Sequence, residues 1–346
     1  MKGHFGMINF ESDYIEGAHP KVLDKLASTN MEKLSGYGND LYTQSAKEKI
    51  KKLINCQNAE VVFLCGGTQT NLIVIDSVLK SFEGVVAVDT GHINVHEAGA
   101  IEATGHKVLT LNNHDGKIDP KELEDYLNNF YDDPNHFHAV YPGMVFISYP
   151  TECGTLYTKA ELKKIHDICG DYNIPLYLDG ARLGYGLMSE DSDMTIENIA
   201  KYTDIFYIGG TKVGALIGEA LIFTNKKVKH ITTRIKQHGG LLAKGRLLGI
   251  QFDVLFTNNL YFDISKHAIE MANFMKGGLT RKGLALYTDS PTNQQFVIIE
   301  NDRYEKSKQY IKSSYWSRYD DNQVVIRLVT SWATRKEDVM RLLDII

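Results

Sequence analysis

The residues Asp204-Ile-Phe-Tyr-Ile-Gly-Gly-Thr-Lys212 join a continuous apolar run to a lysine that is flanked by glycines. An apolar run without polar alternation is typical of a strand that is buried on both faces of a sheet. Runs of the same kind predict further strands at 59–65, 84–89, 107–111, 144–148, 174–179 and 219–223. Helical spacing lies between several of these runs, at 120–130, 159–172 and 195–202. This alternation predicts an α/β fold, in which a large domain has a mainly parallel sheet with helices on both faces.

The pattern changes near residue 250, where we expect a second domain. A long helical stretch at 249–276 is followed by shorter elements, which we expect at 294–300 (strand), 304–314 (helix), 323–330 (strand) and 334–345 (helix). The 346 residues are also more than one compact core usually holds. We therefore expect a large domain at 1–248, which includes the N-terminal segment, and a small C-terminal α+β domain at 249–346.

Composition and charge argue against several classes of function. A net charge of −5 gives no general attraction to nucleic acid or to an anionic membrane, so we expect neither as a partner. The chain shows no signal-peptide core and no Cys-x-x-Cys pair, which favours a cytoplasmic protein. His92 and His96 have the spacing of a metal pair on a helix, but no third ligand accompanies them, so we expect no metal.

The segment Leu64-Cys-Gly-Gly-Thr-Gln-Thr-Asn71 follows one of the expected strands and opens a helical stretch. Glycines at such a turn let backbone N–H groups approach an anion, and the positive end of the helix dipole favours negative charge there. Thr68 adds a hydroxyl donor. The alternative is a tight turn in which Thr68 caps the helix.

Asp179 ends the expected strand in Leu176-Tyr-Leu-Asp-Gly-Ala-Arg182. A carboxylate at the end of a buried strand is costly unless a cation pairs with it. A protonated pyridine nitrogen is such a cation, as in enzymes that use pyridoxal 5′-phosphate (PLP). The alternative is that Asp179 caps the following helix or pairs with Arg182.

Lys212 lies among glycines and apolar residues directly after a strand, where a solvent-facing lysine is not expected. A desolvated amine has a lowered pKa, which suits it to condense with an aldehyde. The order of a glycine turn, a strand-end aspartate and a lysine therefore favours PLP, with Lys212 as the Schiff-base lysine.

The chain resembles the threonine aldolases, a family within the beta-eliminating lyase group of aspartate-aminotransferase-like (fold type I) PLP enzymes. The resemblance runs from about Asn9 to Val339. The motifs that carry it are Glu11-Ser-Asp13, Gly36-Tyr-Gly-Asn-Asp40, Gly66-Gly-Thr-Gln-Thr-Asn71, Gly91-His-Ile-Asn-Val-His-Glu-Ala-Gly99, Asp179-Gly-Ala-Arg182, Gly209-Gly-Thr-Lys212 and Ile326-Arg-Leu-Val-Thr330.

The resemblance implies the roles of the residues that hold the cofactor. His92 stacks on the pyridine ring, Asp179 pairs with the ring nitrogen, and Lys212 binds the aldehyde. Gly67 and Thr68 hold the phosphate. Arg182 and Lys244 complete the residues expected around the cofactor.

The resemblance also implies how the substrate is held. Ser12, Arg182 and Arg327 clamp the carboxylate of a small amino acid, a role that suits the two parallel bonds of a guanidinium. Tyr37 and Lys244 reach the site of a neighbouring subunit. The active form is therefore expected to be a homodimer or homotetramer with sites at the subunit interface.

One position departs from the family pattern. Threonine aldolases carry Thr-His-Asn-Gly at a turn where this chain has Thr151-Glu-Cys-Gly154, so that Glu152 replaces the histidine near the substrate hydroxyl. Glu152, His92, His96 and an ordered water remain the candidates for the base that removes the β-hydroxyl proton.

The expected activity is that of a carbon–carbon lyase of amino acid metabolism. It cleaves the Cα–Cβ bond of a β-hydroxy-L-amino acid, of the threonine, allo-threonine or phenylserine type, to glycine and an aldehyde. The alternatives are β-elimination or racemisation of another small amino acid, or an amino-acid-binding protein without catalysis. A nucleotide-dependent oxidoreductase is disfavoured because the chain lacks the Gly-x-Gly-x-x-Gly fingerprint.

Overall fold

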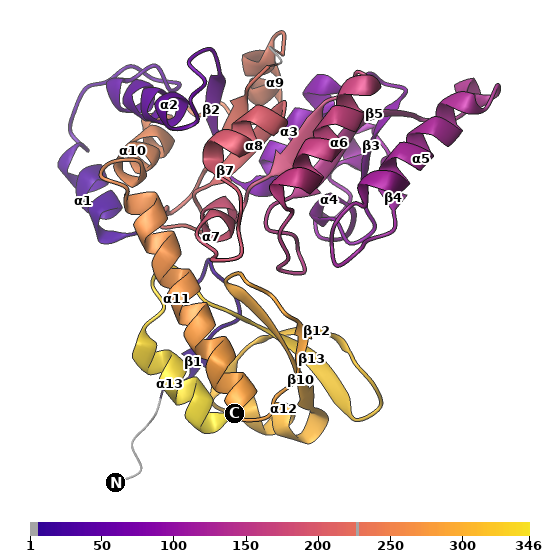
Figure 1. Cartoon of the computed structure of the whole chain (residues 1–346). Coiled ribbons are helices and arrows are strands. Elements are labelled where there is room, and N and C mark those ends of the chain that lie inside the picture. Colours follow the sequence, from indigo (N-terminus) through magenta and orange to yellow (C-terminus); the bar gives the residue numbers. More distant parts are fainter. Residues whose placement is uncertain (1–5, 226–227) are drawn as a thin grey trace.

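The chain folds into a large α/β part and a smaller part that lies against one end of the large sheet (Figure 1). The computed structural model describes residues 6–225 and 228–346. The expected fold class is confirmed, because a mostly parallel sheet is covered by helices on both faces and a separate antiparallel sheet follows it.

The large sheet has seven strands in the order β2-β8-β7-β6-β5-β3-β4. Only β8 runs antiparallel to its neighbours, while the other strands share one direction. The strands are β2 (Glu60–Leu64), β3 (Glu83–Val88), β4 (Val108–Leu111), β5 (Tyr141–Ser148), β6 (Leu176–Asp179), β7 (Ile205–Gly209) and β8 (Glu219–Phe223).

Two hydrophobic cores lie on the two faces of this sheet, because successive side chains of a strand point to opposite faces. In β5, Val145 and Ile147 belong to one core, and Met144 and Phe146 belong to the other. This arrangement explains why the strands read as continuous apolar runs rather than as alternating ones.

The helices of the large part begin with caps that the sequence supplies. Thr158 forms a capping box with Glu161, and Asp119 caps a helix that opens with Pro120. These helices are α1 (Pro20–Ser28), α2 (Leu41–Leu53), α3 (Gly67–Val78), α4 (His92–Val95), α5 (Pro120–Asp132), α6 (Lys159–Asp171), α7 (Leu183–Leu187), α8 (Ile196–Tyr202), α9 (Ile231–Gln237) and α10 (Arg246–Leu255). Two short 3₁₀ helices lie at Glu102–Thr104 and His136–His138.

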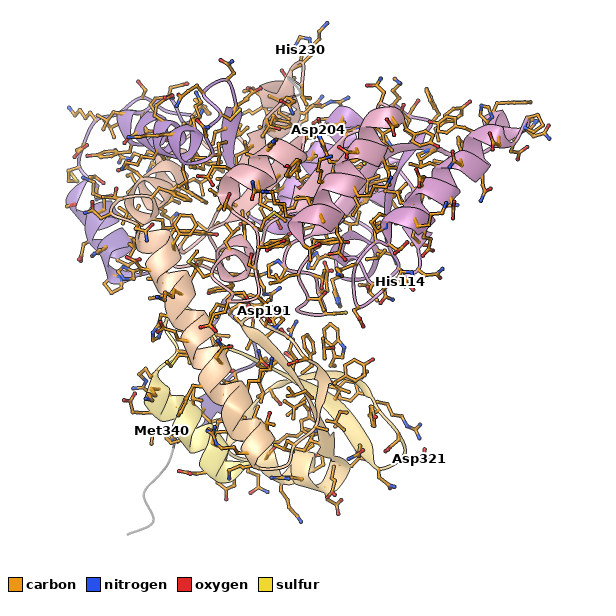
Figure 2. The ribbon with its side chains drawn as sticks, viewed as in Figure 1. His114, Asp191, Asp204, His230, Asp321 and Met340 are labelled. Carbon is orange, nitrogen blue, oxygen red and sulfur yellow. The ribbon has the colours of Figure 1, made fainter. Side chains whose placement is uncertain are left out.

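The carboxyl ends of the parallel strands face the small part. Asp204, which directly precedes β7, lies at the far end of the sheet, whereas Asp191 lies on the side of the small part (Figure 2). The long helix α11 (Leu260–Arg281) runs from the large part along the small one (Figure 1). Ligands of open α/β sheets bind outside the carboxyl ends of the strands, so this junction is where a site is expected.

The small part is built on a four-stranded antiparallel sheet in the order β12-β13-β10-β9. Its core packs the sheet against α11 and α13. Strand β1, near the N-terminus, pairs in parallel with β11 and so lies beside the small part. The remaining elements are β1 (Ile8–Asn9), β9 (Leu286–Thr288), β10 (Gln294–Glu300), α12 (Asn301–Ser307), β11 (Ile311–Lys312), β12 (Ser314–Arg318), β13 (Gln323–Val329) and α13 (Lys336–Ile345).

Two expected helices differ from the structure. The stretch 249–276 is broken between α10 and α11, where Asn258 and Asn259 adopt left-handed backbone angles that end a helix. The helix expected at 304–314 is wrong, because α12 ends at Ser307 and the chain then forms β11 and β12. Pairing of β12 with β13 outweighs the local helical spacing.

The proposed division of the chain between residues 248 and 249 falls inside α10. Of the helices in the described part of the chain, each is too short or too polar to cross a membrane.

Candidate active site

Two cavities meet at the carboxyl ends of the strands, and four side chains line both of them. The first, here called the sheet cavity, has a volume of about 230 Å³. Its lining residues are Cys65, Gly66, Gly67, Thr68, His92, Ser148, Pro150, Glu152, Asp179, Ala181, Arg182, Tyr207, Thr211, Lys212 and Glu219.

The second, here called the interdomain cavity, has a volume of about 410 Å³ and lies between the large and small parts. Its lining residues are Tyr14, His92, His96, Glu152, Arg182, Lys212, Gln294, Ser314, Tyr315, Trp316 and Arg327. Segments from the N-terminal region, the large sheet and the small sheet therefore meet at one place.

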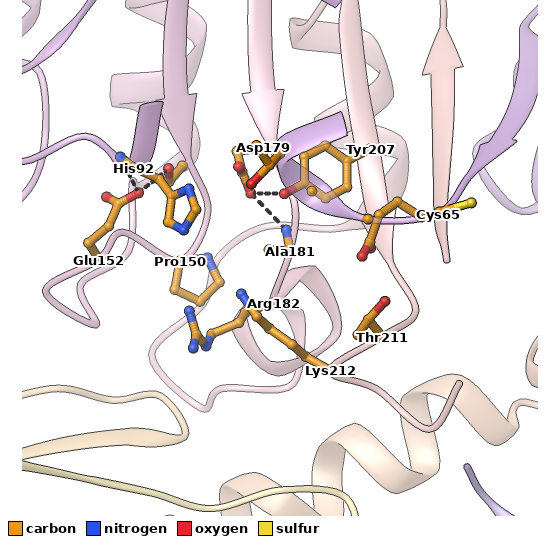
Figure 3. A pocket seen from close by; sticks show the side chains of 15 residues that line it. Cys65, His92, Pro150, Glu152, Asp179, Ala181, Arg182, Tyr207, Thr211 and Lys212 are labelled. Atoms are coloured by element: carbon orange, nitrogen blue, oxygen red, sulfur yellow. Dashed lines mark hydrogen bonds between the residues drawn. The ribbon is translucent and has the colours of Figure 1, made fainter. Parts of the chain in front are cut away.

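Asp179 lies at the end of β6 and is 6% exposed. Its carboxylate accepts hydrogen bonds from the Tyr207 hydroxyl (2.5 Å) and the Ala181 N–H (2.9 Å), which Figure 3 shows, and from the Asn71 amide (3.2 Å). Arg182 does not pair with it, so that alternative is wrong. A buried carboxylate surrounded by neutral donors fits a cationic ring nitrogen.

Lys212 follows β7 and points into both cavities. Burial, and after it the charge of Arg182, lowers the pKa of the Lys212 amine below its usual value. A larger share of neutral amine favours condensation with an aldehyde, as the sequence pattern predicts.

The glycine turn before α3 lies at the other end of the sheet cavity. The N-cap residue of α3 is Gly66, and no side chain caps this end of the helix. Thr68 lies inside the helix, so the alternative in which Thr68 caps it is wrong. A side chain at Gly66 would meet no atom within 4 Å, whereas one at Gly67 would lie 3.1 Å from the Tyr207 hydroxyl. The open space at a helix N-terminus fits a phosphate group.

His92 is held by a hydrogen-bond network that also reaches Asp179. Its Nδ1 lies 2.8 Å from Oε1 of Glu97, which also accepts from the Asn71 amide at 2.7 Å. Burial lowers the pKa of His92, but the hydrogen bond to Glu97 and the charges of Asp179 and Glu97 outweigh it and raise that pKa. This geometry fixes the imidazole ring beside the cavity.

Three buried donors have no acceptor among the described residues, and two of them belong to residues that line the interdomain cavity. They are Ser12 Oγ, Gln294 Nε2 and Arg327 Nε. The terminal nitrogens of Arg327 donate to Gln294 Oε1 (3.1 Å) and Ser314 Oγ (3.4 Å), which leaves Nε free. Unsatisfied buried donors are costly, and a cluster of them fits an anionic ligand such as a carboxylate.

Arg182 forms a bidentate ion pair with Asp13, with contacts of 2.7 and 3.0 Å. Burial would raise the pKa of Asp13, but the charges of Arg182 and Lys212 together with the hydrogen bonds from Arg182 and Asn293 outweigh it and lower that pKa. Asn293 also donates to Asp13 at 2.9 Å. The pair leaves only one terminal nitrogen of Arg182 for the carboxylate that it was predicted to clamp.

Glu152 lines both cavities and lies next to His92 (Figure 3). Its Oε1 accepts from the Ser148 hydroxyl (2.6 Å) and the His92 N–H (3.1 Å). Burial raises the pKa of Glu152, although the bond from Ser148 opposes the shift. Glu152 is thus a carboxyl group whose carboxylate takes up a proton more readily than an exposed glutamate does.

The other predicted residues lie at or outside the edge of the site. His96 lines the interdomain cavity, and its ring centroid is 5.7 Å from that of His92. The part of the chain that the structure describes holds no group of three metal-ligand side chains. Tyr37 and Lys244 line neither cavity and lie exposed on the surface.

The sequence analysis assigned no role to several residues of the site. Asp13, Asn71 and Glu97 lie inside the motifs quoted above, and this is the feature of the sequence that could have identified them as site residues. Glu219 was counted as an ordinary strand residue, although a carboxyl group at the start of a buried strand is itself unusual. Gln294 gave no signal, because its role depends on a contact with Arg327.

The fold and the site together define a fold type I PLP-dependent enzyme. A family model described as "Beta-eliminating lyase" matches residues 9–302. The chain is 27% identical to a low specificity L-threonine aldolase of a Pseudomonas species, over 96% of this chain and 95% of that protein. The chain belongs to the beta-eliminating lyase family and, within it, to the threonine aldolases.

Solved structures agree with this assignment. The structure of threonine aldolase from Leishmania major superposes with a TM-score of 0.94 at 43% identity, covering 97% of this chain and 98% of that one. Aspartate aminotransferase from Thermus thermophilus has a TM-score of 0.71 at 13% identity, covering 99% and 91% of the two chains, and shares the fold. The expected cofactor, PLP, and the expected enzyme class, a lyase, are confirmed.

Proposed function

We propose that this enzyme cleaves the Cα–Cβ bond of a β-hydroxy-L-amino acid of the threonine, allo-threonine or phenylserine type, with glycine and an aldehyde as products. The observation that carries the proposal is the pair of buried, unpaired donors on Gln294 and Arg327, which line the same cavity as Lys212. The names of the relatives from Pseudomonas and Leishmania major, both threonine aldolases, support the same activity.

The residues of the sheet cavity fit PLP. Lys212 binds its aldehyde carbon, Asp179 faces the ring nitrogen, and His92 covers the ring. Gly67 and Thr68 hold the phosphate at the N-terminus of α3. When bound, PLP supplies an electron sink for the electron pair released at the substrate's Cα.

The donors of the interdomain cavity determine which bond to the substrate Cα is broken. Arg327, Gln294 and Ser12 bind the substrate carboxylate, and Arg182 adds its remaining nitrogen. Holding the carboxylate would fix rotation about the bond between Cα and the nitrogen, and would so determine that Cα–Cβ is the bond that reacts. A carboxylate held elsewhere would expose a different bond and give elimination or racemisation.

We assign the base for the β-hydroxyl proton to Glu152. It lies where the two cavities meet, and its raised pKa lets the carboxylate take up a proton. His92 is less suited, because its raised pKa increases the share of imidazole that already carries the proton, and its Nδ1 is engaged by Glu97. The proton taken by Glu152 leaves the hydroxyl oxygen free to form the aldehyde carbonyl.

A homodimer or homotetramer in the cytoplasm completes the proposal. Tyr37 donates its backbone N–H to the Ala243 carbonyl at 3.1 Å, so Tyr37 and the segment of Lys244 lie together on the surface. From there both can reach the cavity of a second copy. The cytoplasmic location is supported by the four cysteines, which are all free.

A panel of β-hydroxy-L-amino acids tests the activity. Purified enzyme with PLP is expected to release glycine and the matching aldehyde in equal amounts, and light scattering at known concentration measures the assembly. Release of ammonia and a keto acid, or inversion at Cα without cleavage, would replace the aldolase by an eliminating lyase or a racemase.

A further inference from the structure

Glu219 is a buried carboxyl group in the sheet cavity that the proposed reaction does not use. It opens β8, is 4% exposed, and accepts the Gly210 N–H at 3.1 Å. In the sheet it pairs with Leu64, the last residue of β2, directly before the glycine turn. The position is therefore fixed by the backbone of three neighbouring segments.

The same end of the cavity is where the phosphate of PLP is proposed to bind. Glu219 lines the sheet cavity together with Gly66, Gly67, Thr68 and Thr211. Among the described residues that line this cavity, the only lysine and arginine are Lys212 and Arg182. With PLP bound, Lys212 is engaged by the aldehyde and Arg182 by Asp13, so a phosphate next to Glu219 is left without a lysine or arginine partner among the cavity residues of its own chain.

An ionised glutamate beside a phosphate dianion is unfavourable, because like charges at close range in a poorly hydrated site repel strongly. Burial raises the pKa of Glu219 to about 8, although the Thr211 hydroxyl, the Lys212 charge and the Gly210 N–H lower it, and the Asp179 charge raises it. A bound dianion would raise it further. The phenols of Tyr177, Tyr207 and Tyr261 also face this carboxyl group, and burial keeps them protonated.

We propose that Glu219 binds the phosphate of PLP as a neutral carboxylic acid, which donates its hydroxyl proton to a phosphate oxygen. The inference rests on the cofactor site described under the proposed function. Retention of the cofactor is then coupled to pH, since loss of the Glu219 proton replaces a donor by a repelling charge. No step of the carbon–carbon cleavage depends on this proton.

The test measures binding to the apoenzyme rather than activity. Pyridoxamine 5′-phosphate has no aldehyde, so its affinity does not depend on reaction with Lys212, and pyridoxamine lacks only the phosphate. For wild type, the dissociation constant of the phosphate compound is expected to rise about tenfold per pH unit above the Glu219 pKa. For pyridoxamine it is expected to stay constant over the same range.

Two variants separate Glu219 from other groups. Glu219→Gln keeps a donor that cannot ionise, so the affinity for pyridoxamine 5′-phosphate should become independent of pH. Cys65→Ser removes a neighbouring thiol that also titrates in alkali, and the pH dependence should persist. The Cys65 thiol has a pKa that burial raises above its usual value.

An affinity that is flat with pH in wild type, or that falls equally in wild type and Glu219→Gln, would overturn the proposal. The first result would mean that a cation, such as one from a second subunit, pairs with an ionised Glu219. If Glu219→Gln fails to fold, the same titration in the Lys212→Ala apoenzyme still decides, because any contrast between the two ligands that remains there cannot come from the Lys212 amine. Failure of the aldolase proposal would appear separately, as lack of glycine and aldehyde at neutral pH.

Discussion

The sheet cavity and the interdomain cavity differ in whether their polar groups have hydrogen-bond partners within the protein. In the sheet cavity, Asp179 accepts three hydrogen bonds from protein groups, and His92 is held by Glu97. In the interdomain cavity, donor nitrogens on Gln294 and Arg327 have no partner among the described residues. The cofactor half is thus a preorganised site, whereas the substrate half has donors directed at a group that arrives with the substrate.

The difference follows from how each cavity is built. The sheet cavity comes from the ends of neighbouring strands, whose positions are fixed by one hydrogen-bonded sheet. The interdomain cavity joins Lys212 of the large part to Gln294 and Arg327 of the small part, and these residues meet only when the two parts pack together. We therefore expect substitutions in the sheet cavity to affect the reaction itself and those in the interdomain cavity to affect substrate affinity.

The largest effect is expected for Lys212→Ala. Without the amine, borohydride should no longer attach the cofactor to the chain, and turnover should fall below detection. Peptide mass spectrometry after reduction measures the attachment, and Lys244→Ala is the control that should keep it. A fully active Lys212→Ala enzyme would refute the role of the sheet cavity.

Asp179→Asn should slow the reaction by about 4 kcal/mol of barrier, or roughly a thousandfold. The amide cannot hold a proton on the ring nitrogen, so the electron sink weakens while PLP stays bound. Single-turnover kinetics measure the rate, and the absorbance spectrum of the bound cofactor shows whether PLP is retained. Rates within twofold of wild type would mean that Asp179 only organises the Ala181 backbone.

Glu152→Gln should reduce carbon–carbon cleavage by about a hundredfold, the usual contribution of a general base. Exchange of the glycine α-proton needs no base at the β-hydroxyl, so it should change little. In wild type, cleavage should fall as pH drops through the raised pKa of Glu152, because protonation removes the base. Equal loss of cleavage and exchange would place the base at His96 or a water.

The smallest effect is expected for Gln294→Leu, which removes one donor to the substrate carboxylate. A lost hydrogen bond to a charged group is worth about 1.5 kcal/mol, so KM should rise roughly tenfold at little change in kcat. Gln295→Leu is the matched control, since Gln295 donates to Ser290 and Thr292 carbonyls and lines neither cavity. A larger effect of Gln295→Leu on KM would contradict the assignment.

The sequence by itself determined the large sheet and the cofactor half of the site. Strands 219–223 and 294–300 were predicted with the bounds that the structure has. Asp179 and Lys212 were found because they follow buried strands, and the ends of neighbouring parallel strands meet at one edge of a sheet. These features depend on short stretches of chain and on local periodicity.

Only the tertiary structure decided which partners these residues have. Arg182 was predicted to hold the substrate, and the structure adds a partner that the sequence did not indicate, Asp13, which is 169 positions away. The segment expected as a helix at 304–314 instead pairs as a strand with β13. Gln294 joins the site through Arg327, 33 positions later. Such contacts form between segments that are distant in the chain, and their energies depend on packing and burial that no local pattern contains.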